Sequence, residues 1–319
     1  MSFTRLTLAA VLALSSAAAA ATTYPSKPIR VIDPYAPGGS TEAQARALGQ
    51  KLTEAWGQAV VIDGRPGAGS AIGTQIAAKS TPDGYTLLFT NAAFATAANL
   101  ARKPLYDPLK DLAPVILVGT QPLILVVHPS LPASLKELLA YAKANPGKIN
   151  FASAGTGGAT HLAMELFKSM AGIDITHVPY KGSAPSATAI IAGEVQMGIF
   201  SGNSVLPHIN AGRLRALGVS TPKRSVALPD VPTITQTGVP GYEVVQWSGI
   251  YAPAGTPREI VTKLNKQINE VLRMSELKER FTRIGVEPAG GTPQEFAAFT
   301  AQEVRKWKKV IDGAGIPRE

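Results

Sequence analysis

The chain has 319 residues, of which 45% are hydrophobic and 17% are charged. It can therefore bury an apolar core rather than remain disordered, and its length suggests two domains or one large one. The sequence contains no cysteine, which excludes disulfides, thiolate metal sites, iron–sulfur clusters and cysteine catalysis. Its 31 Lys and Arg residues against 22 Asp and Glu residues give a net charge of +9, which is compatible with nucleic acid, an anionic membrane or a small acidic ligand as partner.

The start of the chain has the pattern of a secretory signal peptide. Arg5 supplies a positive charge, Leu6–Leu14 is a compact apolar run, and a row of alanines follows up to Ala21. This order predicts that residues 1–21 are a signal peptide, cleaved after Ala20 or Ala21. The apolar run is too short to cross a bilayer core of about 30 Å. The mature protein is therefore expected to be periplasmic and not membrane-embedded, and loss of Arg5 lowers its net charge from +9 to +8.

Short β-prone runs alternate with helical patterns along the rest of the chain. Strands are expected at Ile29–Asp33, Val60–Ile62, Leu87–Phe89, Leu123–Val127, Asn150–Ala152, Ile175–Val178, Met197–Phe200 and Arg215–Val219. Such alternation predicts βαβ units and a largely parallel sheet, and hence an α/β fold.

Start signals mark several of the expected helices. Ser134 and Glu137 form one capping box, and Thr292 and Glu295 form another behind a proline. The segment Thr256–Glu259 combines an N-cap threonine, a proline at the first helical position and a capping box. The last helices are expected to return to the first of two α/β lobes.

Three glycine-rich loops each follow an expected strand and open an expected helix. We call Tyr35–Thr41 the first loop, Asp63–Ser70 the second loop and Ser153–Thr160 the third loop. Each places unpaired backbone N–H groups at the positive end of a helix dipole, which is a geometry that binds anions. In open α/β sheets such loops lie at the carboxyl ends of strands, where ligands bind. Tight strand-to-helix turns are the purely structural alternative for each loop.

Other chemistries have little support in the sequence. Gly67–Gly73 resembles a dinucleotide-binding loop, but its spacing is one residue too long and Ala93–Leu105 contains no acidic residue. No cofactor is therefore expected. The histidines are scattered without metal-ligand spacing, so no metal site is expected either. The cations of the last helix surround Trp307 and are interpreted as a solvated face with a buried indole, rather than a nucleic-acid footprint.

One enzymatic alternative remains open. Ser153 lies in a glycine-rich turn after a strand, and His161 is expected on the helix that begins there. A hydrolase built on Ser153 and His161 is therefore conceivable, although no G-x-S-x-G motif is present. The same glycines explain Ser153 as a hydrogen-bond donor to a ligand. Replacing Ser153 by alanine separates the two: turnover would vanish in a hydrolase, whereas binding would weaken modestly.

Six segments, in order along the chain, resemble signatures of the Bug/TctC family, the extracytoplasmic solute-binding proteins of tripartite tricarboxylate transporters. They are Pro34–Arg46, Arg65–Ser70, Ser153–Gly157 with His161 and Leu162, His177–Gly182, Leu228–Thr233 and Ala252–Pro257. The similarity extends from about Tyr24 to the end of the chain.

The resemblance implies a type II periplasmic-binding-protein fold, with two α/β lobes and a ligand cleft between them. It implies a division into residues 24–122 and 247–319 for lobe 1 and 123–246 for lobe 2. The family typically holds carboxylates through main-chain groups and bridging water. The resulting candidate ligand-binding residues are Tyr35, Pro37, Gly38, Gly39, Ser40, Gly67, Ala68, Gly69, Ser70, Asn91, Ser153, Ala154, Gly155, Thr156, Thr160 and Ser201.

This sequence departs from the family pattern at several positions. Members often have Asp at positions 42, 189 and 201, Asn at 64 and Gly at 70, where this chain has Glu42, Ala189, Ser201, Gly64 and Ser70. Glu42 and Ala189 are expected on helices away from the ligand. Ser201 follows a strand and is expected to face the cleft. Serine cannot pair with a ligand ammonium as an acid would, so the hypothesis is a carboxylate without an amino group.

The sequence thus predicts a non-enzymatic, monomeric solute-binding protein without a cofactor. Its ligand is expected to be a small carboxylate, either a di- or tricarboxylate or an aromatic acid. Lobe closure would capture the ligand for delivery to the membrane permease of a tripartite tricarboxylate transporter. A sensor component that presents its ligand to a receptor is an alternative, because it would use the same cleft. Arg65 and Lys181 are additional cations whose contact with the ligand stays open.

Overall fold

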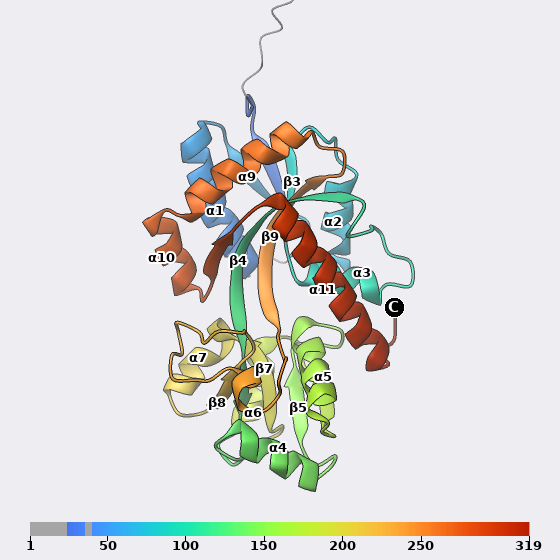
Figure 1. Ribbon diagram of the computed structural model, residues 1–319, viewed down its shortest axis with the longest axis vertical. Coiled ribbons are helices and arrows are strands. Elements are labelled where there is room, and N and C mark those ends of the chain that lie inside the picture. Colours follow the sequence, from blue (N-terminus) through green and yellow to red (C-terminus); the bar gives the residue numbers. More distant parts are fainter. Residues whose placement is uncertain (1–23, 36–39, 319) are drawn as a thin grey trace, which may run out of the picture.

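The computed structural model describes residues 24–35 and 40–318, which form two α/β lobes joined by two long strands (Figure 1). The expected signal peptide therefore lies outside the described residues. Among the helices that are described, none is long and apolar enough to span a membrane. This is the two-lobed α/β architecture that the sequence resemblance implied.

Lobe 1 is built around parallel strands β1, β2 and β3, and lobe 2 around parallel strands β5, β6 and β7. The elements of lobe 1 are β1 (Ile29–Asp33), α1 (Ser40–Trp56), β2 (Val60–Gly64), the 3₁₀ turn η1 (Ala68–Ser70), α2 (Ala71–Ala78), β3 (Thr86–Asn91), α3 (Ala93–Leu100), α9 (Arg258–Leu272), α10 (Ser275–Arg283), β10 (Glu287–Gly290) and α11 (Pro293–Gly313). Those of lobe 2 are α4 (Leu135–Ala144), β5 (Asn150–Ser153), α5 (Ala159–Ala171), β6 (Thr176–Pro179), α6 (Ser183–Ile191), β7 (Met197–Ser201), α7 (Gly202–Asn210), β8 (Arg215–Val219) and α8 (Ile234–Thr237).

Two antiparallel strands, β4 (Leu112–Val127) and β9 (Val245–Pro253), cross between the lobes. The sheet order is β2-β1-β3-β9-β4-β7-β5-β6, with β8 and β10 also paired to β4. The first part of β4, up to Pro122, pairs with β9, and its last part, from Leu123 onward, pairs with β7 and β8. The expected parallel pairing therefore holds within each lobe, whereas the junction is antiparallel because the chain crosses once in each direction.

The helix starts agree with the sequence signals at two positions out of three. Thr292 and Glu295 form the reciprocal capping box of α11, and Ser134 accepts a hydrogen bond from the backbone N of Glu137 at the start of α4. The prediction for Thr256 is wrong. Its hydroxyl donates to the carbonyl of Pro253 at 2.7 Å, so the side chain is already satisfied and α9 begins at Arg258 without a side-chain cap.

A buried carboxylate fixes α11 to the crossing strand β9. Glu303 of α11 accepts hydrogen bonds from the indole N–H of Trp247 on β9 at 3.2 Å and of Trp307 at 2.9 Å. It also pairs with Lys306. Glu303 and both indoles are almost completely buried. Burial of a carboxylate is tolerable here because donors satisfy it, and the arrangement confirms the expected burial of the Trp307 indole.

Replacing Glu303 by alanine is expected to lower the free energy of unfolding by about 2–4 kcal/mol, because two buried indole N–H groups lose their acceptor. Urea unfolding followed by circular dichroism measures this loss. Glu303→Gln is the matched control, since its amide oxygen still accepts from both indoles and the loss should be smaller. Equal losses in the two variants would contradict the role of the shared acceptor.

Candidate functional site

A polar cavity of about 180 Å³ lies where the two lobes meet the crossing strands. Ser40 and Thr41 contribute the start of α1, Asn91 the end of β3, and Ser201 the end of β7 in lobe 2. The remaining wall comes mainly from the two crossing strands. The complete described lining is Ser40, Thr41, Gln44, Asn91, Gly119, Thr120, Gln121, Ser201, Gln246, Trp247, Ser248 and Val286. The structure thus brings three candidate residues, Ser40, Asn91 and Ser201, to one cavity.

The described lining of this cavity contains no charged side chain. Its polar groups are organised by hydrogen bonds between elements: Asn91 donates from Nδ2 to the hydroxyl of Thr41 at 3.0 Å, and Ser248 donates to Oε1 of Gln44 at 2.6 Å. These bonds hold α1 against β3 and β9. The positive end of the α1 dipole therefore faces a neutral polar cavity, an environment that favours an anion.

The described part of the first loop is anchored by buried side chains. The hydroxyl of Tyr35 is 3.0 Å from Thr90 Oγ1 and accepts a hydrogen bond from the backbone N of Asn91 at 3.3 Å. Burial raises the pKa of Tyr35 to about 12. Asp33 accepts from the backbone N of Tyr35 at 3.3 Å, and burial raises the pKa of its carboxyl to about 6. Tyr35 is therefore engaged in supporting the end of β3.

Three of the candidate residues, Pro37, Gly38 and Gly39, lie outside the described residues. The loop that contains them runs between Tyr35 and Ser40, and Ser40 both starts α1 and lines the polar cavity. Their contribution to the site stays a prediction.

The second loop has an unusual backbone. Four consecutive residues have positive φ angles: Gly67 at 141°, Ala68 at 46°, Gly69 at 60° and Ser70 at 91°. For Ala68 and Ser70 this conformation is strained, and such strain persists mainly where function requires it. Ala68 and Gly69 are exposed, whereas Ser70 is buried with its hydroxyl beside Tyr35 and Tyr106 in no well-formed hydrogen bond.

The third loop is held by side chains from within it and from β6. Thr160 accepts a hydrogen bond from the backbone N of Ala154 at 2.9 Å. Ser153 is fully buried, and its hydroxyl is 2.6 Å from Nε2 of His177 and 3.2 Å from both the N and O of Gly155. Thr156 is exposed at the tip. Ser153 and Thr160 are thus internal supports, and the loop offers its backbone and Thr156 to its surroundings.

The proposed pairing of Ser153 with His161 is wrong. The imidazole next to Ser153 is that of His177 on β6, which lies beside β5 through parallel pairing. His161 lies on α5 as expected, but its Nδ1 accepts from the backbone N of Gly157 at 3.0 Å and its Nε2 lies 3.7 Å from Glu165. Because Ser153 is buried and already hydrogen-bonded, its hydroxyl is not presented to the cleft.

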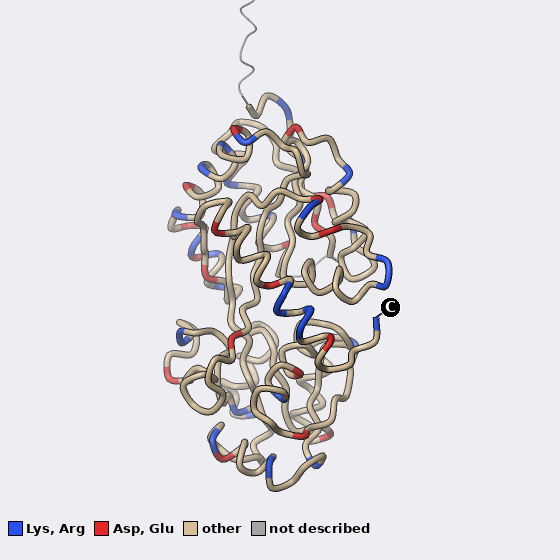
Figure 2. Tube along the Cα trace, turned by 45° about the vertical axis from the view of Figure 1, so that its right-hand side comes forward, with Lys and Arg blue, Asp and Glu red and all other residues tan. Residues whose placement is uncertain are grey.

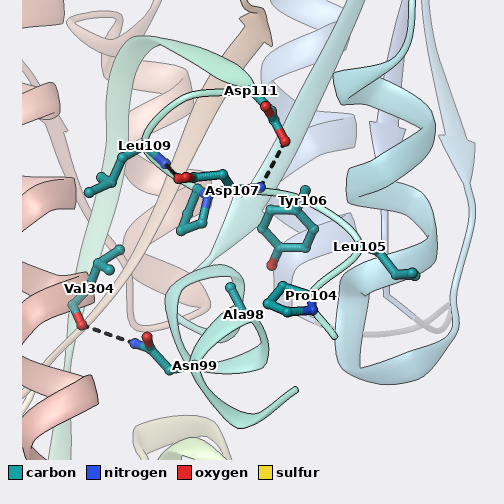
Figure 3. Close-up of a pocket in the computed structure, with 10 residues that line it drawn as sticks. Ala98, Asn99, Pro104, Leu105, Tyr106, Asp107, Leu109, Asp111 and Val304 are labelled. Atoms are coloured by element: carbon teal, nitrogen blue, oxygen red, sulfur yellow. Dashed lines mark hydrogen bonds between the residues drawn. The ribbon is translucent and has the colours of Figure 1, made fainter. Parts of the chain in front are cut away.

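Two larger hollows lie away from the candidate loops. One, of about 480 Å³, is lined by α3, the segment from Pro104 to Asp111 and Val304 of α11 (Figure 3). The other, of about 890 Å³, lies between α5 and α11. None of the candidate ligand-binding residues lines either hollow. Volume alone is therefore a poor guide to the site in this molecule.

Sequence reasoning missed the contribution of the crossing strands. Gly119, Thr120 and Gln121 on β4, with Gln246, Trp247 and Ser248 on β9, form much of the polar cavity. A signal was present, because the polar residues 119–121 interrupt the apolar runs 115–118 and 123–127. Such an interruption marks the point where a strand leaves one core, passes a cleft and enters another.

Charge is not concentrated near the site. Lys and Arg are distributed over both lobes and mixed with Asp and Glu (Figure 2). Glu42 and Ala189 lie on helices α1 and α6, as expected. Arg65 pairs with Asp63 at 3.0 Å. Within the part of the chain that the structure describes, no group of three or more His, Cys, Asp or Glu residues is arranged to hold a metal ion.

Comparison with known proteins matches nearly the whole chain. The model of a family described as "Tripartite tricarboxylate transporter family receptor" matches residues 44–316. Protein BugT of Bordetella pertussis is 41% identical over 303 residues, covering 94% of this chain and 93% of that protein. The structure of R. palustris Rpa4515 with adipate has a TM-score of 0.78 and 38% identity, covering 92% of this chain and 99% of that one. MatC from Rhodopseudomonas palustris with bound malate has a TM-score of 0.74 and 30% identity, covering 90% and 100%.

Ser70→Gly is expected to raise the free energy of unfolding by about 1 kcal/mol. Release of about 1–3 kcal/mol of backbone strain at φ 91° exceeds the entropic cost of glycine, about 0.5–1 kcal/mol. Thermal and urea unfolding measure the difference. Ser70→Ala, which keeps the strained φ and removes the same hydroxyl, is the matched control and should not stabilise. A destabilised glycine variant would contradict the strain.

Proposed function

Because the chain belongs to the family of tripartite tricarboxylate transporter receptors, we propose that it is a periplasmic solute-binding protein that captures a small carboxylate and delivers it to a membrane permease. The observation that carries this proposal is the polar cavity, which collects uncharged hydrogen-bonding groups from both lobes beside the start of α1. A cavity of this kind can solvate a carboxylate without a permanent counter-charge.

The proposed ligand site combines the cavity with the three loops. Ser40, Asn91 and Ser201 bind directly, and Pro37, Gly38 and Gly39 stay candidate ligand-binding residues. Gly67, Ala68 and Gly69 offer backbone N–H groups from lobe 1, and Gly155 and Thr156 offer theirs from lobe 2. Tyr35, Ser70, Ser153, Ala154 and Thr160 support these loops from beneath.

The binding free energies of helix N-termini and hydrogen bonds together are sufficient to hold a carboxylate. An anion at a helix N-terminus gains about 0.3–1 kcal/mol, and up to about 2 when partly buried. The helices α1, α2 and α5 begin at the three loops, so together they contribute at most about 6 kcal/mol. Micromolar affinity requires about 8 kcal/mol. Hydrogen bonds to the charged group, at about 1.5–3 kcal/mol each, supply the remainder.

We propose that the lobes close by rotation about the crossing strands. The moving units are residues 24–122 with 247–319, and residues 123–246, because the partners of β4 change between Pro122 and Leu123. Ligand contacts that form only when both lobes meet favour the closed state. In this scheme the chain acts as a monomer, and the permease recognises the closed form.

The proposed ligand class is a dicarboxylate without an amino group. Similar proteins were solved with adipate and with malate, and the described cavity lining offers no acid to pair with an ammonium. Transport is preferred over the alternative of a ligand-presenting sensor, since the matching family is that of transporter receptors. Uptake of labelled dicarboxylate by a deletion strain distinguishes these roles, because only a transport protein is needed for accumulation.

Succinate is expected to bind more tightly than aspartate, because aspartate must desolvate an ammonium that finds no carboxylate partner. Isothermal titration calorimetry of this matched pair measures the difference. Tighter binding of aspartate would contradict the proposed ligand class.

Ser201→Asp provides the reciprocal test. The added carboxylate is expected to weaken succinate binding by about tenfold or more, through like-charge repulsion in a partly buried site. Asn210→Asp adds the same charge at the exposed end of α7 and serves as the control. An equal effect of the two substitutions would remove Ser201 from the site.

A further inference from the structure

Two histidines are stacked beneath the third loop. The ring centroids of His161 and His177 are 3.8 Å apart, with planes inclined by 17°. Phe151 of β5 stacks on His177 at 4.9 Å. His161 comes from α5 and His177 from β6, so the pair joins the helix that follows the third loop to the strand beside it. Packing alone would not require two imidazoles at this place.

Each histidine is bonded to the third loop by a nitrogen of its ring. His177 Nε2 is 2.6 Å from the hydroxyl of Ser153, at the first residue of the loop. His161 Nδ1 accepts the backbone N–H of Gly157, in the middle of the loop, at 3.0 Å. Gly157 approaches lobe 1 closely, since a Cβ there would lie 2.9 Å from Leu100 on α3. The pair therefore fixes a loop segment that contacts both lobes.

A proton on His161 Nδ1 is incompatible with this arrangement for a geometric reason. His161 accepts the Gly157 N–H only while Nδ1 carries no proton. Two stacked rings at 3.8 Å cannot both carry a charge at low cost. We propose that the neutral pair His161–His177 positions the third loop for ligand binding, and that proton uptake by the pair releases the loop and lowers ligand affinity. The ligand part of this inference rests on the proposed function.

Charged groups from two helices surround the pair. On α5, Glu165 faces His161 and Lys168 acts on Glu165. Across the neighbouring hollow, α11 presents Glu303, Lys306 and Lys309 to the same space as Glu165. The neighbours on β5, Phe151 and Ser153, are uncharged. Burial, together with His161, lowers the pKa of His177 to about 4, and Glu165 offsets this only in part.

The lowered pKa of His177 makes folded stability depend on pH. The ordinary pKa of histidine is about 6.5, and that of His177 in the folded protein is about 4. The unfolded chain therefore takes up the proton first as the pH falls. Folded stability therefore decreases between about pH 6.5 and pH 4, and does not decrease further below that range through this group. The third loop of the folded protein is released only as the pH falls through the folded pKa of His177, about 4.

The first experiment uses the Gly157 amide and needs no ligand. Nuclear magnetic resonance of the ¹⁵N-labelled protein follows this signal from about pH 7.5 to about pH 3, on both sides of the folded pKa of His177. In the unsubstituted protein the Gly157 resonance should shift together with the imidazole signals of the pair. In His161→Gln, whose amide oxygen can accept the same N–H without titrating, it should not shift. A Gly157 resonance that is independent of pH in the unsubstituted protein would overturn the proposal.

The second experiment measures adipate binding by calorimetry. His161→Phe keeps a stacked ring but loses the acceptor, and should weaken binding about tenfold at neutral pH, as expected for one lost hydrogen bond. His161→Gln should restore binding to within about threefold. A merely packing role for His161 predicts the opposite order and would refute the positioning role.

The pH profile of adipate affinity separates proton linkage from titration of the ligand itself. The doubly substituted His161→Gln, His177→Gln protein should lose less affinity than the unsubstituted protein between neutral pH and about pH 3.5, a range that spans the folded pKa of His177, because ligand titration is common to both. His128→Gln, in which another serine-bonded histidine is replaced, should behave like the unsubstituted protein. Identical profiles for the double variant and the unsubstituted protein would overturn the linkage. If adipate does not bind, the ligand assignment fails while the Gly157 measurement still decides the positioning role.

Discussion

The antiparallel pairing of β4 with β9 is the constraint on which the site depends. β4 is one continuous strand of 16 residues that belongs to the sheets of both lobes. Its registers with β9 and with β7 fix where Thr120 and Ser201 lie relative to each other. Because the same strand pair is the only covalent path between the lobes among the described residues, a rotation of the lobes must be absorbed there. Site geometry and lobe movement are thus set by the same backbone hydrogen bonds.

A site without charged side chains has a particular balance of costs. A buried arginine would attract every anion strongly, but it would itself have to be desolvated and paired when the site is empty. Hydroxyls and amides can instead satisfy one another, as Gln44 and Ser248 do here. Selection among acids then depends on the number and direction of hydrogen bonds, which suits a receptor that must also release its ligand.

Local signals in the sequence predicted much of the fold, because the strands are short apolar runs and the loops have glycines where helices begin. Residues 119–121 were not recognised as part of the site, since the register of two strands distant in sequence decides which side chains meet. His177 became the partner of Ser153 for the same reason: parallel pairing of β5 with β6 brings position 177 beside the loop, whereas helical spacing alone suggested His161. The hydroxyl of Thr256 was misassigned because its acceptor, Pro253, became identifiable only from the folded turn.

The shared carboxylate of Glu303 has an optical consequence. The chain contains three tryptophans, and two of them, Trp247 and Trp307, donate to this one carboxylate. Trp247 also lines the polar cavity on the crossing strand. Indole emission responds to nearby charge and to water, so the emission of these two indoles depends on the carboxylate that they share. For the lobe closure proposed above, Trp247 is placed as a label-free reporter, because it lies on the crossing strand and shares its acceptor with α11.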